Sequence, residues 1–153
     1  MNAAIALLLS LQMSISGASC GLVQREMLPI LADLFKVSRT PSKETERALF
    51  VTRDDDGKLQ SQLWPATYER RKASFHGAVP ANTVGIAHTH PNGMPEPSRH
   101  DIDEAQRTGL PIFVVTRTSI ARVDPDRTTR HLVTKKDWYG AWRRTGDACA
   151  ALS

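Results

Sequence analysis

The fold and the chemistry of this chain are best predicted from one stretch, His88-Thr-His-Pro-Asn-Gly-Met-Pro-Glu-Pro-Ser-Arg-His-Asp101. His88 and His90 are separated by one residue, so on an extended strand their side chains point to the same side. The ten residues between His90 and Asp101 contain an Asn-Gly pair and three prolines, which predict a loop. Two imidazoles and one carboxylate suit a catalytic zinc site, which keeps a fourth position for water. The stretch therefore predicts His88, His90 and Asp101 as ligands of Zn2+.

Ser98 lies three residues before Asp101, at the start of a helical pattern that runs to Thr108 and ends at Gly109. This spacing predicts a capping box, with Ser98 as the N-cap and Asp101 at the third helical position. Residues three apart also share one helix face, so the same pair can lie at the edge of a metal site. His100 lies between them, and adjacent helical positions diverge by about 100°, so we expect its side chain to point elsewhere.

The pattern resembles the signature of the JAMM (MPN+) zinc metalloprotease and isopeptidase family, prokaryotic type: His-x-His, Pro, and an Asp preceded three residues earlier by Ser. The resemblance extends over residues 22–134. It implies a Zn2+-dependent hydrolase that cleaves peptide or isopeptide bonds, with an upstream glutamate as general base and Ser98 as the oxyanion donor. The alternative is an inactive MPN-like scaffold that binds zinc or a protein partner without catalysis.

The upstream glutamate of this family is expected at the start of a strand that follows a helix. Apolar residues at helical spacing predict the helix over residues 22–37, and residues 46–52 are typical of the strand. Glu46 matches this context, and the resemblance implies that it is the general base. The family usually has glycine three residues after this glutamate, where Leu49 stands here. Glu44, on the same face of an extended strand, is therefore an alternative, and a third reading makes both of them exposed loop carboxylates.

The rest of the chain alternates short apolar segments with turns. Strands are predicted over residues 58–64, 83–90, 111–116, 119–123 and 131–134. The aromatic residues of the tail are expected to pack against the domain; they are Trp138, Tyr139 and Trp142. The order of helices and strands predicts the α/β class, as a single JAMM-like domain with a mixed central sheet flanked by helices.

The amino terminus predicts an export signal. Residues 1–24 carry no charged side chain, residues 3–11 are almost wholly apolar, and small residues around Ala18 permit cleavage. A basic n-region is missing, so the alternative is a buried first element of the domain. We therefore divide the chain into a candidate signal peptide, residues 1–18, and a JAMM-like metallopeptidase domain, residues 19–153. The protein would be secreted or periplasmic if the signal is cleaved and cytoplasmic otherwise.

Length and charge limit the partners. The 153 residues suffice for one domain with one core, and the net charge of +4 is mildly basic. The short basic cluster at residues 70–72 is typical of a solvated loop, so no nucleic-acid partner is expected. No segment predicts a stable membrane span. The expected partner is a peptide or protein substrate, either a ubiquitin-like conjugate or a cell-wall peptide.

Other zinc motifs fit less well. The His-x-Glu and Pro-Cys-x-x-Cys motifs of zinc deaminases and the His-Glu-x-x-His motif of other metalloproteases are absent from the sequence. A cupin could use Glu96 and His131 beside the His-x-His pair, but it requires an all-β pattern, which the helix that begins near Ser98 contradicts. We expect Cys20 and Cys149 to be free thiols near the two ends, and a disulfide in an oxidising compartment is the alternative.

Overall fold

The computed structural model describes residues 22–39, 45–67, 73–91, 93–134 and 136–152. Its elements are, in chain order, α1 (Leu22–Ser38), β1 (Ala48–Arg53), β2 (Leu59–Leu63), β3 (Thr83–Thr89), α2 (Arg99–Thr108), β4 (Ile112–Val115), β5 (Ile120–Val123), β6 (Thr129–Val133), α3 (Trp138–Thr145) and α4 (Ala148–Leu152). The candidate signal peptide, Cys20, Glu44 and the basic cluster at residues 70–72 lie outside the described residues, and the division into residues 1–18 and 19–153 stays a prediction.

The strands form one mixed sheet with the order β2-β1-β3-β4-β5-β6. β3 and β4 run parallel, and the other neighbouring pairs are antiparallel. Parallel neighbours need a crossover connection, which the loop after β3 and helix α2 supply. The crossover therefore starts at the carboxyl end of β3, where the sequence places its histidines. The predicted α/β class with a mixed central sheet flanked by helices is confirmed.

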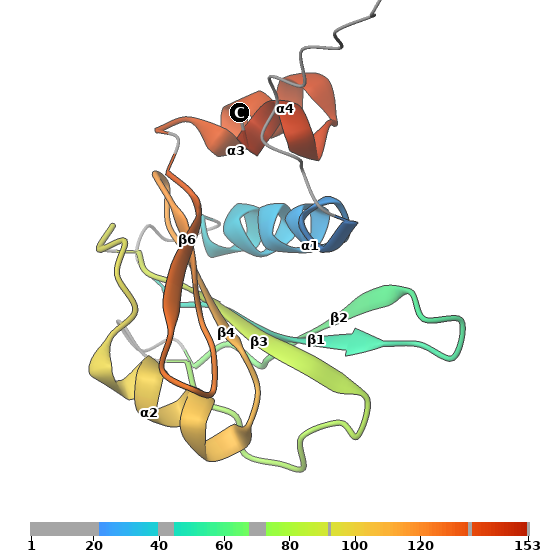
Figure 1. Ribbon diagram of the computed structural model, residues 1–153, viewed down its shortest axis with the longest axis vertical. Coiled ribbons are helices and arrows are strands. Elements are labelled where there is room, and N and C mark those ends of the chain that lie inside the picture. The colour runs from blue at the N-terminus through green and yellow to red at the C-terminus, as the bar shows by residue number, and fades with distance from the viewer. Residues whose placement is uncertain (1–21, 40–44, 68–72, 92, 135, 153) are drawn as a thin grey trace, which may run out of the picture.

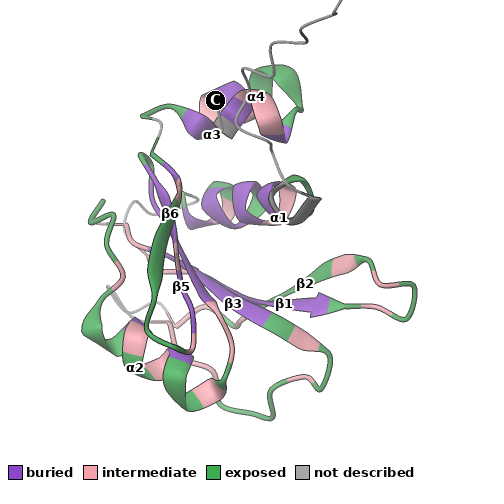
Figure 2. Ribbon diagram, in the orientation of Figure 1, coloured by how far each residue is buried: buried purple, intermediate pink, exposed green. Residues whose placement is uncertain are grey.

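Different helices cover the two faces of the sheet (Figure 1). Leu49 and Val51 of β1 point to the face covered by α1, with α3 and α4 beyond it, and they belong to the larger apolar cluster. Phe50 lies between them in sequence and points to the opposite face, where it packs with Ala105 of α2 in a smaller cluster. This alternation follows from the period of two along a strand. Figure 2 shows the result, with buried residues along the central strands and on the inner side of α1.

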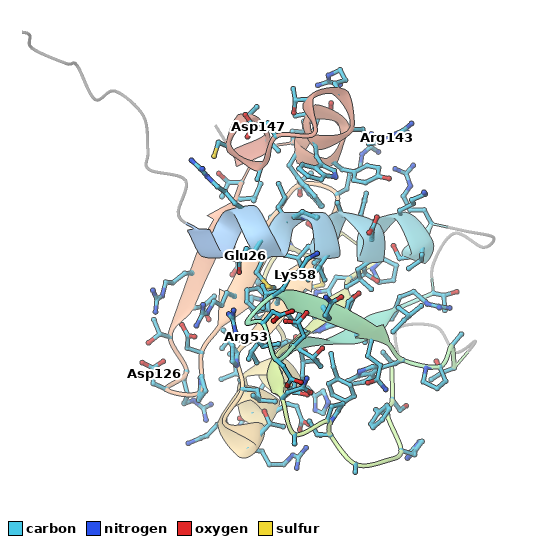
Figure 3. The ribbon with its side chains drawn as sticks, turned by 90° about the vertical axis from the view of Figure 1, so that its right-hand side faces the viewer. Glu26, Arg53, Lys58, Asp126, Arg143 and Asp147 are labelled. Carbon is cyan, nitrogen blue, oxygen red and sulfur yellow. The ribbon has the colours of Figure 1, made fainter. Side chains whose placement is uncertain are left out.

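Most charged side chains of the described residues lie outside this apolar interior, and the buried exceptions include Asp101 and Asp124. Glu26 of α1, Arg53 and Lys58 of the first hairpin and Asp126 near β6 are exposed and are labelled in the side view of Figure 3. No described helix is both long and apolar enough to cross a membrane.

Two details of the predicted elements differ from the structure. β1 begins at Ala48, so Glu46 precedes the strand as an extended residue and is not its first member. The tail forms helices α3 and α4, which were not predicted from the sequence.

The predicted packing of Trp138 is confirmed, because its ring is fully buried and its Nε1–H donates to the Thr116 carbonyl at 2.9 Å. Cys149 of α4 is disulfide-bonded, so the expectation of a free thiol is wrong for this residue.

Candidate metal centre

The alternation of β3 places both histidines on the α2 face. Ile86 of this strand packs in the smaller apolar cluster, and His88 follows two residues later on the same side. His90 lies one step beyond the end of the strand, where its backbone N–H donates to the Val115 carbonyl of β4 at 3.1 Å. This bond keeps the chain extended, so His90 follows His88 on the same face. His88 is buried, and His90 is half-buried.

The first turn of α2 brings Asp101 to these histidines. Ser98 is the N-cap, with φ −72° and ψ 166°, and its Oγ accepts from the Asp101 backbone N–H at 3.2 Å. In return, Asp101 Oδ2 accepts from the Ser98 backbone N–H at 2.6 Å and from the Ser98 hydroxyl at 2.7 Å. The predicted capping box is therefore confirmed. It fixes the carboxylate of Asp101, which is buried, and leaves Oδ1 directed toward His88.

The three side chains form a compact triangle of donor atoms. His88 Nε2 lies 3.0 Å from His90 Nε2 and 3.2 Å from Asp101 Oδ1, and His90 Nε2 lies 3.6 Å from Asp101 Oδ2. In tetrahedral zinc sites with bonds of about 2.0–2.2 Å, ligand atoms lie about 3.3–3.6 Å apart. The distance from His90 to Asp101 Oδ2 lies within that range, and the two distances from His88 are 0.1 and 0.3 Å shorter than its lower limit. Among the described residues, His88, His90 and Asp101 are the cluster that could hold a metal ion. The fold therefore brings together two nitrogen donors and one oxygen donor, as the sequence predicted.

A backbone carbonyl in the loop after β3 sets the orientation of His90. Its Nδ1 lies 3.0 Å from the Met94 carbonyl oxygen. Because a carbonyl can only accept, Nδ1 must carry the proton, and the lone pair then belongs to Nε2, which faces the other donors. A hydrogen bond of this kind behind a ligating imidazole is the usual way in which proteins orient it. The loop thus has a function beyond connecting β3 to α2.

Burial and charge favour the unprotonated forms of His88 and Asp101, which suit a cation, whereas His90 holds its proton more strongly. Burial lowers the pKa of His88 to about 4, so its imidazole is neutral near neutral pH. Burial opposes ionisation of Asp101, but interactions with His90, His88 and Ser98 outweigh it and hold the pKa of Asp101 well below its usual range. Burial also acts to lower the pKa of His90, but the interactions with Asp101 and with the Met94 carbonyl outweigh it and raise the pKa. A bound cation would compete with that proton.

Glu46 is brought to the same place by the pairing of β1 with β3. Ala48 lies opposite His88 in the antiparallel register, and Glu46, two residues earlier, continues on the same face toward His90. Its Oε1 lies 4.0 Å from His88 Nε2, and its carboxylate accepts from the backbone N–H of Ala73. Burial is the main reason that the pKa of Glu46 is raised to about 7. The structure therefore places Glu46 beside the donor triangle, and it does not describe Glu44.

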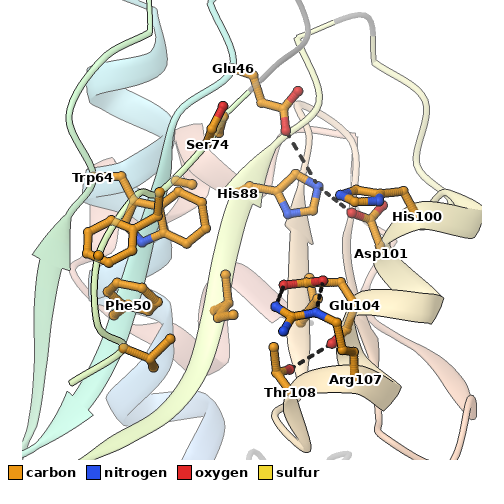
Figure 4. Close-up of a pocket in the computed structure, with 17 residues that line it drawn as sticks. Glu46, Phe50, Trp64, Ser74, His88, His100, Asp101, Glu104, Arg107 and Thr108 are labelled. Carbon is orange, nitrogen blue, oxygen red and sulfur yellow. Dashed lines mark hydrogen bonds and ion pairs between the residues drawn. The ribbon is translucent and has the colours of Figure 1, made fainter. Parts of the chain in front are cut away.

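These groups open into one cavity of about 500 Å³ between the sheet and α2 (Figure 4). Glu46, His88 and Asp101 line one end of it. His100 also lines it and lies beside Asp101 in Figure 4, so the expectation that His100 points elsewhere is wrong. His100 is exposed in the first turn of α2. It lies at the open edge of the cavity, next in sequence to Asp101, whose side chain faces inward.

Three other predicted residues take different places. Ser98 is exposed and is not among the residues that line the cavity; its hydroxyl is directed to Asp101. Glu96 and His131, the pair that a cupin would use, do meet, with Oε1 and Nε2 3.1 Å apart. Neither joins the donor triangle, and α2 excludes an all-β fold. The aromatic half of the cavity, with Phe50, Trp64 and Phe75, was not predicted from the sequence.

The family model of the prokaryotic homologs of the JAB domain matches residues 39–132, which is more than half of the chain. The chain belongs to this family. The resemblance drawn from the His-x-His motif is thus confirmed at the level of the family, and the matched segment contains Glu46 and the whole donor triangle. A JAB-family fold with this cluster is compatible with a JAMM-type zinc site.

Among solved structures, the chain is similar to one described as "JAMM: A Metalloprotease-like Zinc Site in the Proteasome and Signalosome". The two share 16% identity with a TM-score of 0.44, over 69% of this chain and 88% of that chain. No curated protein matches the sequence.

Proposed function

We propose that this JAB-family protein is a zinc-dependent hydrolase of peptide or isopeptide bonds and that Glu46 is its general base. One observation carries the proposal. Two of the three donors, His88 and Asp101, line the same end of one cavity as Glu46, whose Oε1 lies 4.0 Å from His88 Nε2. A base at this distance is near enough to contact a water that also reaches the donor triangle, yet its carboxylate is not one of the three donors.

The proposed ligands are His88, His90 and Asp101, and zinc held by them would supply Lewis-acid activation of water and of a carbonyl group. Glu46 accepts a proton from the attacking water as the new carbon–oxygen bond forms. It then delivers that proton to the leaving amine as the carbon–nitrogen bond breaks. The products are a carboxylic acid and an amine, and Glu46 returns to its starting state.

Ser98 is the proposed donor to the oxyanion of the tetrahedral intermediate. In the structure its hydroxyl donates to Asp101 Oδ2 at 2.7 Å, so this role requires the hydroxyl to turn from Asp101 toward the substrate. The same bond supports a second role, in which Ser98 holds the Asp101 carboxylate in place. The substrate class stays at the level of a peptide or protein, with a ubiquitin-like conjugate and a cell-wall peptide as the proposed candidates.

The experiment that tests the proposal separates the base from the ligands. The full chain is purified without added metal, its zinc content is measured by elemental analysis, and hydrolysis of peptide and isopeptide reporters is assayed. Glu46→Gln should retain zinc while kcat falls by about 10²–10⁴, the usual contribution of a general base. Glu26→Gln, on the exposed side of α1, is the matched control and should change neither quantity.

Three outcomes distinguish the alternatives. If Glu44→Gln abolishes hydrolysis and Glu46→Gln does not, the base is two residues earlier and the mechanism survives. If neither change affects hydrolysis while zinc stays bound, Glu46 is not the base. If the wild-type protein binds zinc but hydrolyses no reporter, the alternative of a binding scaffold replaces the hydrolase.

A further inference from the structure

The end of the cavity away from the donor triangle is built from aromatic side chains, and we call it the aromatic pocket, formed by Phe50, Trp64 and Phe75. Their ring centroids lie 5.0 Å apart for Phe50 and Trp64, 4.7 Å for Phe50 and Phe75, and 5.5 Å for Trp64 and Phe75. Phe50 is fully buried, while Trp64 and Phe75 are half-buried and line the cavity. The cluster therefore forms a wall with one side open, rather than a closed part of the core.

The facing wall comes from α2 and carries no uncompensated charge. Glu104 and Arg107 line it, and they pair with each other, with Arg107 Nε donating to Glu104 Oε2 at 2.8 Å (Figure 4). Away from the donor triangle and His100, they are the charged groups among the described residues that line the cavity. A charged side chain entering the aromatic pocket would lose its water without gaining a free partner, so the pocket favours an apolar occupant.

One polar atom of the aromatic wall is unpaired. Trp64 Nε1 is buried, and no hydrogen-bond acceptor for it lies within the described part of the chain. A buried N–H without an acceptor costs free energy, whereas a bound group with an acceptor at the right place would remove that cost. This observation favours a pocket that is completed by a ligand.

The register of the sheet places the aromatic pocket two strand residues away from the donor triangle. Ala48 lies opposite His88, and Phe50 lies opposite Ile86 in the antiparallel pairing of β1 with β3. Two residues along a strand correspond to about 6.6 Å, a distance that a large side chain next to a bond held at the donor triangle can bridge. A bond held at the donor triangle therefore presents the side chain of a flanking residue to the aromatic pocket.

We propose that the aromatic pocket is a specificity subsite, which accepts a large apolar side chain, preferably aromatic, from the substrate residue next to the scissile bond. This inference rests on the proposed hydrolase function. The cavity as a whole measures about 500 Å³, within the range of ligand-binding pockets, so it can hold such a side chain together with the flanking backbone.

The test measures binding separately from cleavage. The probes are the peptides acetyl-Gly-Gly-Gly-X-Gly-Gly-Gly-amide, with X as Phe, Leu, Ala or Asp, titrated by calorimetry into the zinc-loaded Glu46→Gln variant. Binding is expected in the order Phe, Leu, Ala, Asp, with Phe about ten- to hundredfold tighter than Ala from the apolar area that it buries. Hydrolysis of the same peptides by the wild-type protein should follow the same order in kcat/KM.

Two pairs of variants, in the same Glu46→Gln background, locate the preference. Trp64→Ala should reduce the Phe-to-Ala ratio to near one, while Trp142→Ala, which removes a half-buried tryptophan on the other side of the sheet, should leave the ratio unchanged. Val79 is exposed at the pocket, so Val79→Asp tests the same point without disturbing the core. Val84→Asp, at an exposed valine that does not line the cavity, is its control.

Equal binding of the Phe and Ala peptides, or no binding of either, would overturn the subsite. The subsite would also be overturned if the preference for the Phe peptide persisted both in Val79→Asp and in a Trp64→Ala variant that folds. The two proposals fail in different ways. If the wild-type protein cleaves all the peptides equally, the hydrolase stands and the subsite falls. If it cleaves neither these peptides nor an isopeptide reporter while the Phe peptide binds preferentially, the aromatic pocket stands as a binding site for apolar side chains and the hydrolase falls.

Discussion

The two faces of the sheet are built for different purposes. On the α1 face, the side chains of α1, α3 and α4 pack into one continuous apolar cluster that includes Leu31, Phe35 and Trp138. On the α2 face, the buried cluster of described residues has only five members and gives way to a cavity with Glu46 and two of the candidate metal donors, His88 and Asp101, at one end. The α1 face therefore provides most of the burial, while the α2 face presents polar groups to a space that a ligand can enter.

The helices on these faces are also held differently. Among its described residues, α1 buries Ser38 and six apolar side chains, namely Met27, Leu28, Leu31, Ala32, Leu34 and Phe35. α2 buries only Asp101 and Ala105, and it is fixed at its two ends by the Ser98 capping box and by Gly109 in the left-handed conformation. A helix held by its caps can carry Asp101 at a cavity without filling that cavity with its own side chains. The residues that stabilise the fold are therefore largely separate from those of the candidate site.

The largest expected effect is the loss of the proposed zinc from the α2 face. The double variant His88→Ala/His90→Ala removes two of three donors, so zinc should fall from one equivalent per chain to a background level. The matched control is His76→Ala/His131→Ala, which changes two exposed histidines outside the triangle and should retain zinc. Elemental analysis of protein purified without added metal measures both. Equal zinc in the wild type and the His88/His90 variant would falsify the assigned centre.

The next effect belongs to the α1 face. Leu31 is almost fully buried, and Leu31→Ala should lower the free energy of unfolding by about 2–5 kcal/mol, as other large-to-small core changes do. Zinc content at a temperature well below melting should not change, because no donor contacts this face. Ile102→Ala makes the same kind of change at a half-buried position on α2 and should cost clearly less. Denaturant titration compares the two, and an equal or larger loss for Ile102→Ala would contradict the division between the faces.

A smaller effect is expected at Ser98, which caps α2 and is also the proposed oxyanion donor. Removal of the hydroxyl removes the cap of α2, which should cost about 1 kcal/mol of stability. If Ser98 is also the oxyanion donor, kcat should fall by about 10²–10³ with little change in KM. Ser98→Thr keeps a hydroxyl and an acceptable cap, so it should recover most of both losses. A loss of stability without a loss of kcat would leave Ser98 as a residue that only positions Asp101.

The contacts close to the motif could be predicted from the sequence because they are set by local periodicity. A spacing of two on a strand put His88 and His90 on one face, and a spacing of three in a helix produced the capping box of Ser98 and Asp101. Glu46 could be placed near them only through the resemblance to a family. Its position depends on the pairing register between β1 and β3, which cannot be predicted from the local sequence.

The aromatic pocket and the tail could not be predicted in the same way. Trp64 and Phe75 are eleven residues apart in the sequence, and they meet beside Phe50 only in the folded chain. The tail helix α3 has only eight residues and contains Gly140, which weakens the helical signal. It is stabilised by packing onto α1, where Trp138 contacts Phe35, and such tertiary packing outweighs local propensity.

The smallest expected effect tests the claim that α2 depends on its caps. Gly109 has φ 69° and ψ 14°, and its N–H donates to the Ala105 carbonyl at 3.0 Å. A Cβ at this position would meet no described atom within 4 Å, so Gly109→Ala introduces backbone strain without a clash. The left-handed conformation costs a residue with a Cβ about 1–2 kcal/mol, and the free energy of unfolding should fall by about that amount. Gly109→Asn should lose less, because asparagine tolerates this conformation better. Zinc content should stay at one equivalent in both variants, since Asp101 lies two turns away at the other end of the helix. If Gly109→Ala lowers zinc content as well as stability, the two ends of α2 are coupled, and the chemistry of this face is less separable from its stability than the structure indicates.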